Sequence, residues 1–266
     1  MPKLRLDKMI WSHSRISSFE QCPLGWWYSY HYKINRNINN AFAEYGSLCH
    51  ELIQHQMVFK QRGMPLQTNE EMKDYFQNGF YHMSTKFLSS KMKREYLYDG
   101  IDYFRNWDSF EGYNVKAIEE FTNWEMADYP CYGGMDLLLE KDDKFYLIDH
   151  KSSKPYDAQK MNKKIKQLYF YGPAVKSLFG KHPEYVGFNF FRKNKLQIFE
   201  WDTDKFVNML EWFESTVKKI KATKDFVANP NAFFCNHICN HRFTCPKKSN
   251  TKKKPVPVNT DFEGFE

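Results

Sequence analysis

The sequence lacks the hydrophobic segments that mark secreted and membrane proteins. Its N-terminal region holds no apolar stretch that resembles a signal peptide. No apolar run approaches the roughly 20 residues that a membrane-spanning helix needs. We therefore expect a cytoplasmic protein without a membrane partner. Cysteines are normally reduced in that compartment, so we expect no disulfides among the six cysteines.

The chain also lacks internal repeats and any phosphate-binding loop of the G-x-x-x-x-G-K type. The absence of that loop excludes a recognisable nucleotide-driven motor, so any work on nucleic acid would proceed without a helicase of its own. What the chain does have is 266 residues with 42% apolar content, enough for a real hydrophobic core. Its net charge of +7 favours polyanionic partners without proving any.

Residues 133–153, GGMDLLLEKDDKFYLIDHKSS, contain two apolar runs that each carry one aspartate. The runs, 135–140 and 144–150, are separated by two consecutive aspartates. This pattern predicts a β-hairpin with a two-residue turn. An aspartate inside each apolar strand then needs an explanation.

The register of that hairpin suggests one. If Lys141 faces Lys144 across the turn, Asp136 lies directly opposite Asp149, with Cβ atoms about 5 Å apart. Two like charges at this separation repel unless a cation lies between them. Side chains alternate along a strand, so Lys151 emerges on the same face as Asp149.

Carboxylate oxygens suit hard cations such as Mg²⁺ and Mn²⁺. Such a cation generates hydroxide near neutral pH and stabilises charge on a phosphate. Lys151 is a compact cation able to orient water or to neutralise the phosphate that is cleaved. A surface hairpin with scattered charges explains this stretch, taken alone, equally well.

The remaining periodicity predicts an α/β protein in which helices are followed by three strands, a helix, two strands and a helix. The expected elements are helices over 41–62, 68–90 and 91–107, a strand over 113–126, a helix over 157–179, a second hairpin turning near Lys193 and Asn194, and a helix of about twenty residues from Asp204.

A cysteine-rich segment, FCNHICNHRFTCP, follows the last helix. It places three cysteines within eleven positions: Cys235, Cys239 and Cys245. This density indicates a metal site. An iron–sulfur cluster needs a fourth thiolate, which Cys22 could supply. The alternative is a zinc site completed by His237 or His241.

His50, Glu51 and His55 partly match the zinc-protease motif. That motif needs its histidines four residues apart, on one face of a helix. Here they are five apart, which rotates them by about 140°, so a zinc protease is excluded. His50 by itself remains either a third metal ligand or a solvent-facing histidine.

Five motifs together resemble the PD-(D/E)XK nucleases, specifically the RecB-like and AddB-like nuclease domains and the CRISPR-adaptation exonucleases that carry an iron–sulfur cluster. The motifs are GSLCH ending at His50, GGMD ending at Asp136, the D-x-K of Asp149 to Lys151, the Q-x-x-x-Y of Gln167 and Tyr171, and one cysteine near the N-terminus with three near the C-terminus. The resemblance covers roughly residues 12–246.

This resemblance implies a restriction-endonuclease-like fold, in which helices flank a mixed sheet. A helical insertion would span about 51–112, within a nuclease domain over 1–246. The cysteine segment over 233–246 would share an iron–sulfur cluster with the N-terminal segment, and the cluster would join the two ends of the chain.

The resemblance also assigns roles to individual residues. It implies a divalent metal held by His50, Asp136, Asp149 and the backbone carbonyl of His150, with Asp136, Asp149 and Lys151 catalytic, Gln167 and Tyr171 positioning substrate, and Cys22, Cys235, Cys239 and Cys245 binding a 4Fe-4S cluster. Spacing does not select among Glu119, Glu120 and Glu125 as a further ligand.

The implied activity is a Mg²⁺- or Mn²⁺-dependent DNA exonuclease. It would act on single-stranded or end-processed DNA in recombination, repair or replication. One alternative is a zinc-bound endonuclease that is specific for branched structures. The other is a non-catalytic DNA-binding subunit of a repair complex, against which the intact set of Asp136, Asp149 and Lys151 argues.

Aromatic residues and the C-terminal tail give two further expectations. Aromatic residues make up 18% of the chain. Four of them are candidates for stacking on unpaired bases, although core packing is favoured for most: Trp26, Trp27, Phe190 and Phe191. The Lys-rich and then acidic tail, 247–266, is expected to be disordered. It could contact phosphates, dock its DFEGFE end on a protein partner, or be inert.

Overall fold

The computed structural model describes residues 6–34 and 38–246, so the predicted tail lies outside the described residues. The chain divides into two compact units. The first consists of Met1–Asp7, Ser14–Ile38 and Thr216–Glu266, and the second of Lys8–His13 and Asn39–Ser215. The sheet belongs to the second unit, and the four cysteines of the predicted cluster belong to the first.

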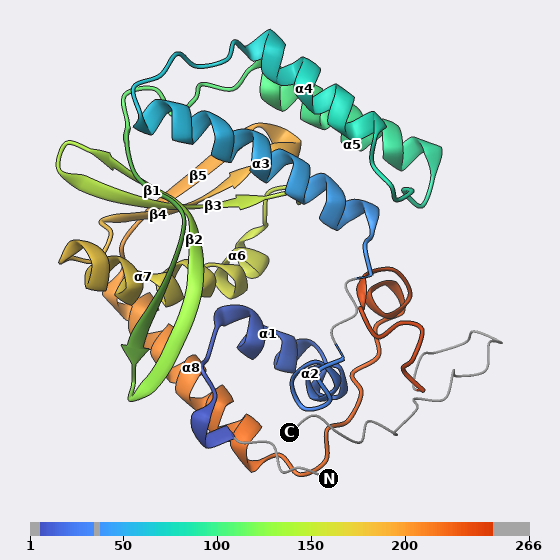
Figure 1. Ribbon diagram of the computed structural model, residues 1–266. Helices are drawn as coiled ribbons and strands as arrows, with labels where there is room; N and C mark the ends of the chain where they lie inside the picture. The colour runs from blue at the N-terminus through green and yellow to red at the C-terminus, as the bar shows by residue number, and fades with distance from the viewer. Residues whose placement is uncertain (1–5, 35–37, 247–266) are drawn as a thin grey trace, which may run out of the picture. The chain divides into compact units, whose positions relative to one another are not determined.

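The second unit is built on a five-stranded mixed sheet, which confirms the predicted α/β class (Figure 1). The strands are β1 (Asn114–Met126), β2 (Tyr129–Lys141), β3 (Lys144–Lys151), β4 (Tyr185–Phe190) and β5 (Lys195–Glu200). They lie in the order of the sequence. All neighbours pair antiparallel except β3 and β4, which pair parallel.

The predicted hairpin register is confirmed. Lys141 faces Lys144, and the ladder between β2 and β3 continues to the pair of Leu137 and Ile148. Asp142 and Asp143 form the turn with φ of +52° and +58°. Two consecutive positive φ values are typical of the type I′ turn that joins two strands with their natural twist.

Helices α3 (Ala41–Gln61), α4 (Asn69–Tyr81) and α5 (Ser90–Arg105) lie on one side of the sheet (Figure 1). Their core includes Tyr45, Ile53, Phe76, Phe104 and, from the sheet, Leu137 and Ile148. The predictions of helix over 68–90 and 91–107 are wrong for residues 82–89, which connect two separately capped helices. Thr68 caps α4 and Ser89 caps α5, each by accepting a backbone N–H.

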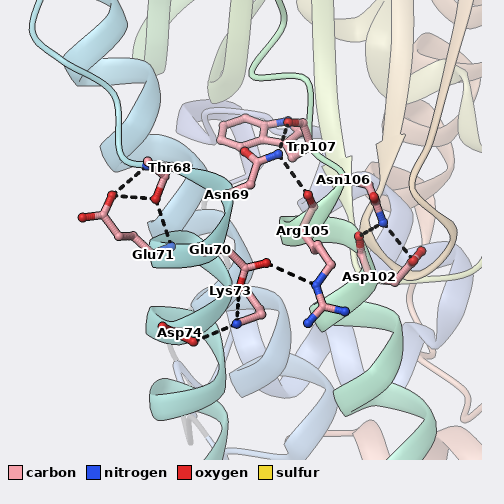
Figure 2. A network of polar contacts seen from close by, with 10 residues as sticks. All are labelled: Thr68, Asn69, Glu70, Glu71, Lys73, Asp74, Asp102, Arg105, Asn106 and Trp107. Carbon is pink, nitrogen blue, oxygen red and sulfur yellow. Dashed lines mark hydrogen bonds and ion pairs between the residues drawn. The ribbon is translucent and has the colours of Figure 1, made fainter.

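A polar network joins the start of α4 to the end of α5 (Figure 2). The Asn69 amide donates to the backbone carbonyls of Arg105 and Trp107, at 3.0 Å each. Glu70 pairs with Lys73 and with Arg105. The two helices are therefore held to each other at this end through both backbone and side chains.

Helices α6 (Ala158–Lys164) and α7 (Lys166–Phe179) lie on the other side of the sheet (Figure 1). The sequence predicted a single helix over 157–179. The helix breaks at Ile165, whose ψ of −22° tightens the local turn. Buried side chains of α7 pack inward: Leu168, Phe170, Ala174 and Val175.

The first unit contains α2 (Pro23–Tyr30), most of α1 (His13–Gln21), the C-terminal end of α8 (Thr203–Ala222) and the π-helical turn η3 (Phe234–Ile238). Trp26 stacks on Phe226, with ring centroids 5.6 Å apart and planes 4° apart, and packs edge-on against Phe19. The described residues also form two short 3₁₀ helices, η1 (Leu6–Lys8) and, in the second unit, η2 (Phe191–Lys193). Among the described residues, no helix has the length and apolarity to cross a membrane.

Candidate metal and catalytic site

Two aspartates stand on neighbouring strands next to the last pair of the β2–β3 ladder. Asp149 on β3 is 5% exposed. Asp136 on β2 accepts a hydrogen bond of 2.8 Å from the backbone N–H of His150. Burial and the nearby charge of Asp149 raise the pKa of Asp136 to about 7. The Asp136 carboxyl group therefore ionises less readily than an ordinary aspartate unless a cation lies beside it.

Helix α3 and strand β1 each place one more potential metal ligand beside Asp136. His50 Nδ1 lies 3.6 Å from Glu119 Oε1 and 3.8 Å from Asp136 Oδ2. One ligand atom from each of the three residues lies within 4.8 Å of the others. Burial would lower the pKa of His50, but Glu119, Asp136 and Asp149 outweigh it and raise the pKa above its ordinary value.

Glu119 is therefore the one of three glutamates that the structure places at this site. The flanking pairs of β1 and β2 put it level with Asp136, whereas Glu120 and Glu125 are exposed. Glu119 has φ of +46° inside a strand. That conformation is strained for a residue with a side chain, and such strain clusters at functional sites.

The side-chain amide of Gln167 connects Asp149 and Lys151, the other two charged residues of the site. Lys151 forms an ion pair with Asp149. Gln167 on α7 accepts a hydrogen bond of 2.9 Å from Lys151 Nζ and donates one of 2.7 Å to Asp149 Oδ1. Burial would lower the pKa of Lys151, but Asp149 outweighs it and raises this pKa. Lys151 is therefore held in its charged form.

Tyr171 lies one turn after Gln167 and faces the same group of carboxylates. Burial, followed by Asp149 and Asp136, raises the pKa of its hydroxyl, which therefore stays protonated at neutral pH. A Cβ atom on Gly133 would lie 2.6 Å from Tyr171 Cε1. Glycine at this position of the GGMD motif is what lets the tyrosine ring lie against β2.

The side chain of His150 points away from Asp149 and Lys151, as strand alternation requires. Its ring is buried, and its Nδ1 lies 3.1 Å from the Asn189 amide, which donates to the Tyr103 hydroxyl at 2.6 Å. Burial, then His50 and Lys151, hold the pKa of His150 well below its ordinary value. Asn189 and Tyr103 were not singled out from the sequence, because nothing local connects them to residue 150.

An open groove runs along this site. Its lining comes mainly from α3 and the β1–β2 pair and includes Phe42, Gly46, His50, Glu119, Phe121 and Asp136. His50, Glu119 and Asp136 have side chains that are 29%, 28% and 18% exposed. The potential ligands are thus reachable from solvent, as substrate access requires.

Three of the four aromatics considered for base stacking belong to the core. Phe190 and Phe191 are fully buried and Trp26 is 1% exposed, so none of them can offer a ring to a base. Trp27 is half-buried and is stacked on both His31 and Phe226. Core packing, the favoured alternative, holds for the three buried rings.

The four cysteines of the second predicted site line one cavity in the first unit: Cys22, Cys235, Cys239 and Cys245. No disulfide joins the cysteines of the described residues. Backbone N–H groups point at the sulfurs of Cys22, Cys235 and Cys239. Gly25 and Asn229 donate to Cys22, Asn231 donates to Cys235, and His241 donates to Cys239, at 3.3–3.5 Å.

The chain matches one protein family and is similar to several solved structures. The profile of the PD-(D/E)XK nuclease superfamily matches residues 10–246. No curated protein matches the chain. A crystal structure described as that of a candidate exonuclease from Eubacterium rectale is 12% identical, with a TM-score of 0.54, and the match covers 96% of this chain and 93% of that one. The crystal structure of SSO0001 is 13% identical, with a TM-score of 0.39, over 91% and 88% of the two chains.

Proposed function

The chain belongs to the PD-(D/E)XK nuclease superfamily, and on this premise we propose that it is a metal-dependent enzyme that hydrolyses phosphodiester bonds of DNA. One observation supports the proposal. His50, Glu119 and Asp136 gather in one open groove, and Asp149, on the strand next to Asp136, forms an ion pair with Lys151. The groove is open to solvent, and a cation bound there would balance the charge of its acidic groups.

We assign the metal ligands to His50, Glu119, Asp136, Asp149 and the backbone carbonyl of His150. This donor set fits a divalent cation, because the Glu119 carboxylate and the His50 imidazole lie beside Asp136. Burial, followed by the charge of Asp149, raises the pKa of Asp136 to about 7, and a bound cation would offset both effects. Oxygen-rich sites favour Mg²⁺ and Mn²⁺. When bound, such an ion polarises the phosphate and supplies hydroxide near neutral pH.

Lys151 is the catalytic cation of the chain itself. Its ammonium group stays charged beside Asp149 and is fixed in place by Gln167. In this position it stabilises negative charge that develops on the phosphate as the bond breaks. Gln167 orients Lys151 and Asp149 together, and Tyr171 supplies a protonated hydroxyl next to the same carboxylates.

The finer proposal is an exonuclease that acts on single-stranded or end-processed DNA in recombination, repair or replication. It rests on the resemblance of the five motifs to RecB-like and AddB-like nucleases. The description of the Eubacterium rectale structure as a candidate exonuclease supports it. Suitable side chains stand at each proposed metal-ligand and catalytic position, which favours an enzyme over a non-catalytic DNA-binding subunit.

The cysteine cavity is proposed to hold a 4Fe-4S cluster with a structural role. Backbone N–H groups directed at the sulfurs suit thiolate ligands, which accept hydrogen bonds. Cys22 lines the same cavity as the three C-terminal cysteines, as a cluster with four thiolate ligands requires.

The test is cleavage of a linear single-stranded DNA and of a circular single-stranded DNA, with Mg²⁺ or Mn²⁺ and with chelator. An exonuclease degrades the linear DNA, leaves the circle whole and stops with chelator. Glu119→Ala should remove the activity, whereas the neighbouring Glu120→Ala should keep it, because the Glu120 side chain is exposed and outside the ligand set. Cleavage of the circle would contradict the exonuclease, and equal activity of both variants would contradict the ligand assignment.

A further inference from the structure

Two exposed aromatic rings lie next to each other on the β1–β2 pair. Phe121 is 59% exposed and Tyr132 is 42% exposed. Their ring centroids are 6.0 Å apart and their planes are inclined by 27°, a stacked arrangement. Large rings that are this exposed lose the favourable burial that normally fixes them. A stacked pair at the surface therefore calls for an explanation beyond packing.

The position of Phe121 links this pair to the metal site. Phe121 follows Glu119 by two residues on β1 and lines the same groove as His50 and Asp136. A strand of DNA whose phosphate is held at those ligands must pass through this groove. The base of a neighbouring nucleotide is then the group that meets the exposed face of Phe121.

The missing side chain of Gly134 makes room for the Phe121 ring. The two residues are direct cross-strand partners. A Cβ atom on Gly134 would lie 2.7 Å from Phe121 Cε1 and 2.9 Å from Cζ. Because Gly134 has no Cβ, the ring can approach the backbone of β2 closely. An aromatic residue covering a glycine of a paired strand stabilises a sheet, but even with this contact and with Tyr132 beside it, Phe121 stays 59% exposed.

We infer that Phe121, supported by Tyr132, is a stacking platform for an unpaired nucleobase of the strand that is cleaved. The inference rests on the proposed function and deepens it. Every base offers a π-face, so stacking is tolerant of sequence, and it requires a base that is free of its partner. The substrate class is therefore a single-stranded DNA end, with Phe121 as a substrate-positioning residue.

The experiment compares two linear single-stranded oligonucleotides, one of normal composition and one with abasic positions at the end that is degraded. kcat/KM is measured for the wild type and for Phe121→Ala, Phe121→Trp and Tyr98→Ala. Tyr98 on α5 is the matched control, because it is 64% exposed and does not line the groove. Phe121→Ala should lower kcat/KM on the normal strand by about tenfold, whereas Phe121→Trp and Tyr98→Ala should keep it.

The abasic substrate separates stacking from a structural role. If Phe121 stacks on a base, the wild type loses about the same factor on the abasic strand as Phe121→Ala loses on the normal one, and the two losses do not add. An equal loss for Phe121→Ala on both substrates, or no loss on either, overturns the stacking platform while leaving the nuclease. A wild type that cleaves neither substrate overturns the proposed function and this inference with it.

Discussion

Gln167 is not a proposed metal ligand, but it contacts two charged residues of the candidate site. Its single amide accepts from Lys151 and donates to Asp149. The two charged groups attract each other, but attraction alone does not fix an orientation. The amide does so, because its oxygen and nitrogen can satisfy the two partners in only one way.

We predict that Gln167→Ala lowers the cleavage rate by about 10- to 100-fold, as is common when a supporting partner of a metal site is lost. The matched control is Gln159→Ala on α6, because Gln159 is exposed. Rates measured at saturating Mn²⁺ separate this positioning effect from weaker metal binding. A Gln167→Ala variant as active as Gln159→Ala would show that Lys151 needs no orientation by the amide.

The sequence was informative about this site where chemistry and alternation coincide. Asp136, Asp149 and Lys151 were predicted to share one face because the hairpin register and the alternation of side chains along a strand place them there. Glu119 could not be separated from Glu120 in this way. The register of β1 shifts between Val115 and Ala117, and residue 119 has a positive φ, so counting by twos along the strand fails there.

At the scale of elements, Glu44 joins α3 to the segment between α4 and α5. Its carboxylate accepts the backbone N–H groups of Ser84 and Thr85, at 2.6 and 2.9 Å, and both of their hydroxyls. Burial would raise the pKa of Glu44, but these hydrogen bonds outweigh it and hold the pKa below its ordinary value. The contact therefore stabilises the fold only while Glu44 is ionised.

We predict that Glu44→Gln lowers the free energy of unfolding by about 1–2 kcal/mol at pH 7, because a neutral amide cannot accept four hydrogen bonds. Since the pKa is depressed in the folded state, the stabilisation is present above the ordinary pKa of 4.5 and is lost as pH falls through the folded value. Denaturant unfolding at a series of pH values measures this. The difference in the free energy of unfolding between wild type and variant should vanish in acid. The control Glu51→Gln, an exposed position on the same helix, should show no such difference at any pH. A difference for Glu44→Gln that is independent of pH would contradict the account.

Elements were predictable where local signals are strong. The two-residue turn of the β2–β3 hairpin and the helix over 41–62 follow from turn chemistry and apolar periodicity. The break at Ile165 and the non-helical segment 82–89 were missed. Apolar periodicity continues through both. The interruptions are made by His82 at the end of α4, by the N-cap Ser89 at the start of α5 and by the tightened turn at Ile165. A single residue of these types is not a distinctive signal in a sequence.

At the scale of the whole molecule, the first unit brings residues from both ends of the chain together. Cys22 caps the start of α2. Cys235 lies in η3 and Cys239 follows its end, more than 200 residues later in the sequence. The proposed cluster, if bound by these cysteines, would close a very long loop. Cross-links of that kind remove much of the freedom of the unfolded chain.

We predict that Cys239→Ser abolishes iron incorporation and the brown colour, and lowers the thermal stability of the protein. Cys131→Ala is the matched control, because Cys131 is buried on β2 in the other unit and should leave the iron content unchanged. Iron, zinc and the visible spectrum are measured on protein purified without air. A colourless wild type that contains zinc would contradict the cluster.

The family and the mixed sheet could be inferred from the sequence because five motifs occur in the right order. The division into two compact units could not, since it arises from contacts between segments far apart in the chain. A single nuclease domain over 1–246 stays a prediction. The role of the tail beyond residue 246 likewise stays a prediction.

The central claim is that His50, Glu119, Asp136 and Asp149 hold a divalent cation. The most direct measurement is a calorimetric titration of the purified protein with Mn²⁺, repeated for Glu119→Ala and Glu120→Ala. The account predicts saturable binding by the wild type and by Glu120→Ala, displaced by Mg²⁺, and its loss in Glu119→Ala. No saturable binding by the wild type, or the same binding by Glu119→Ala, would contradict it.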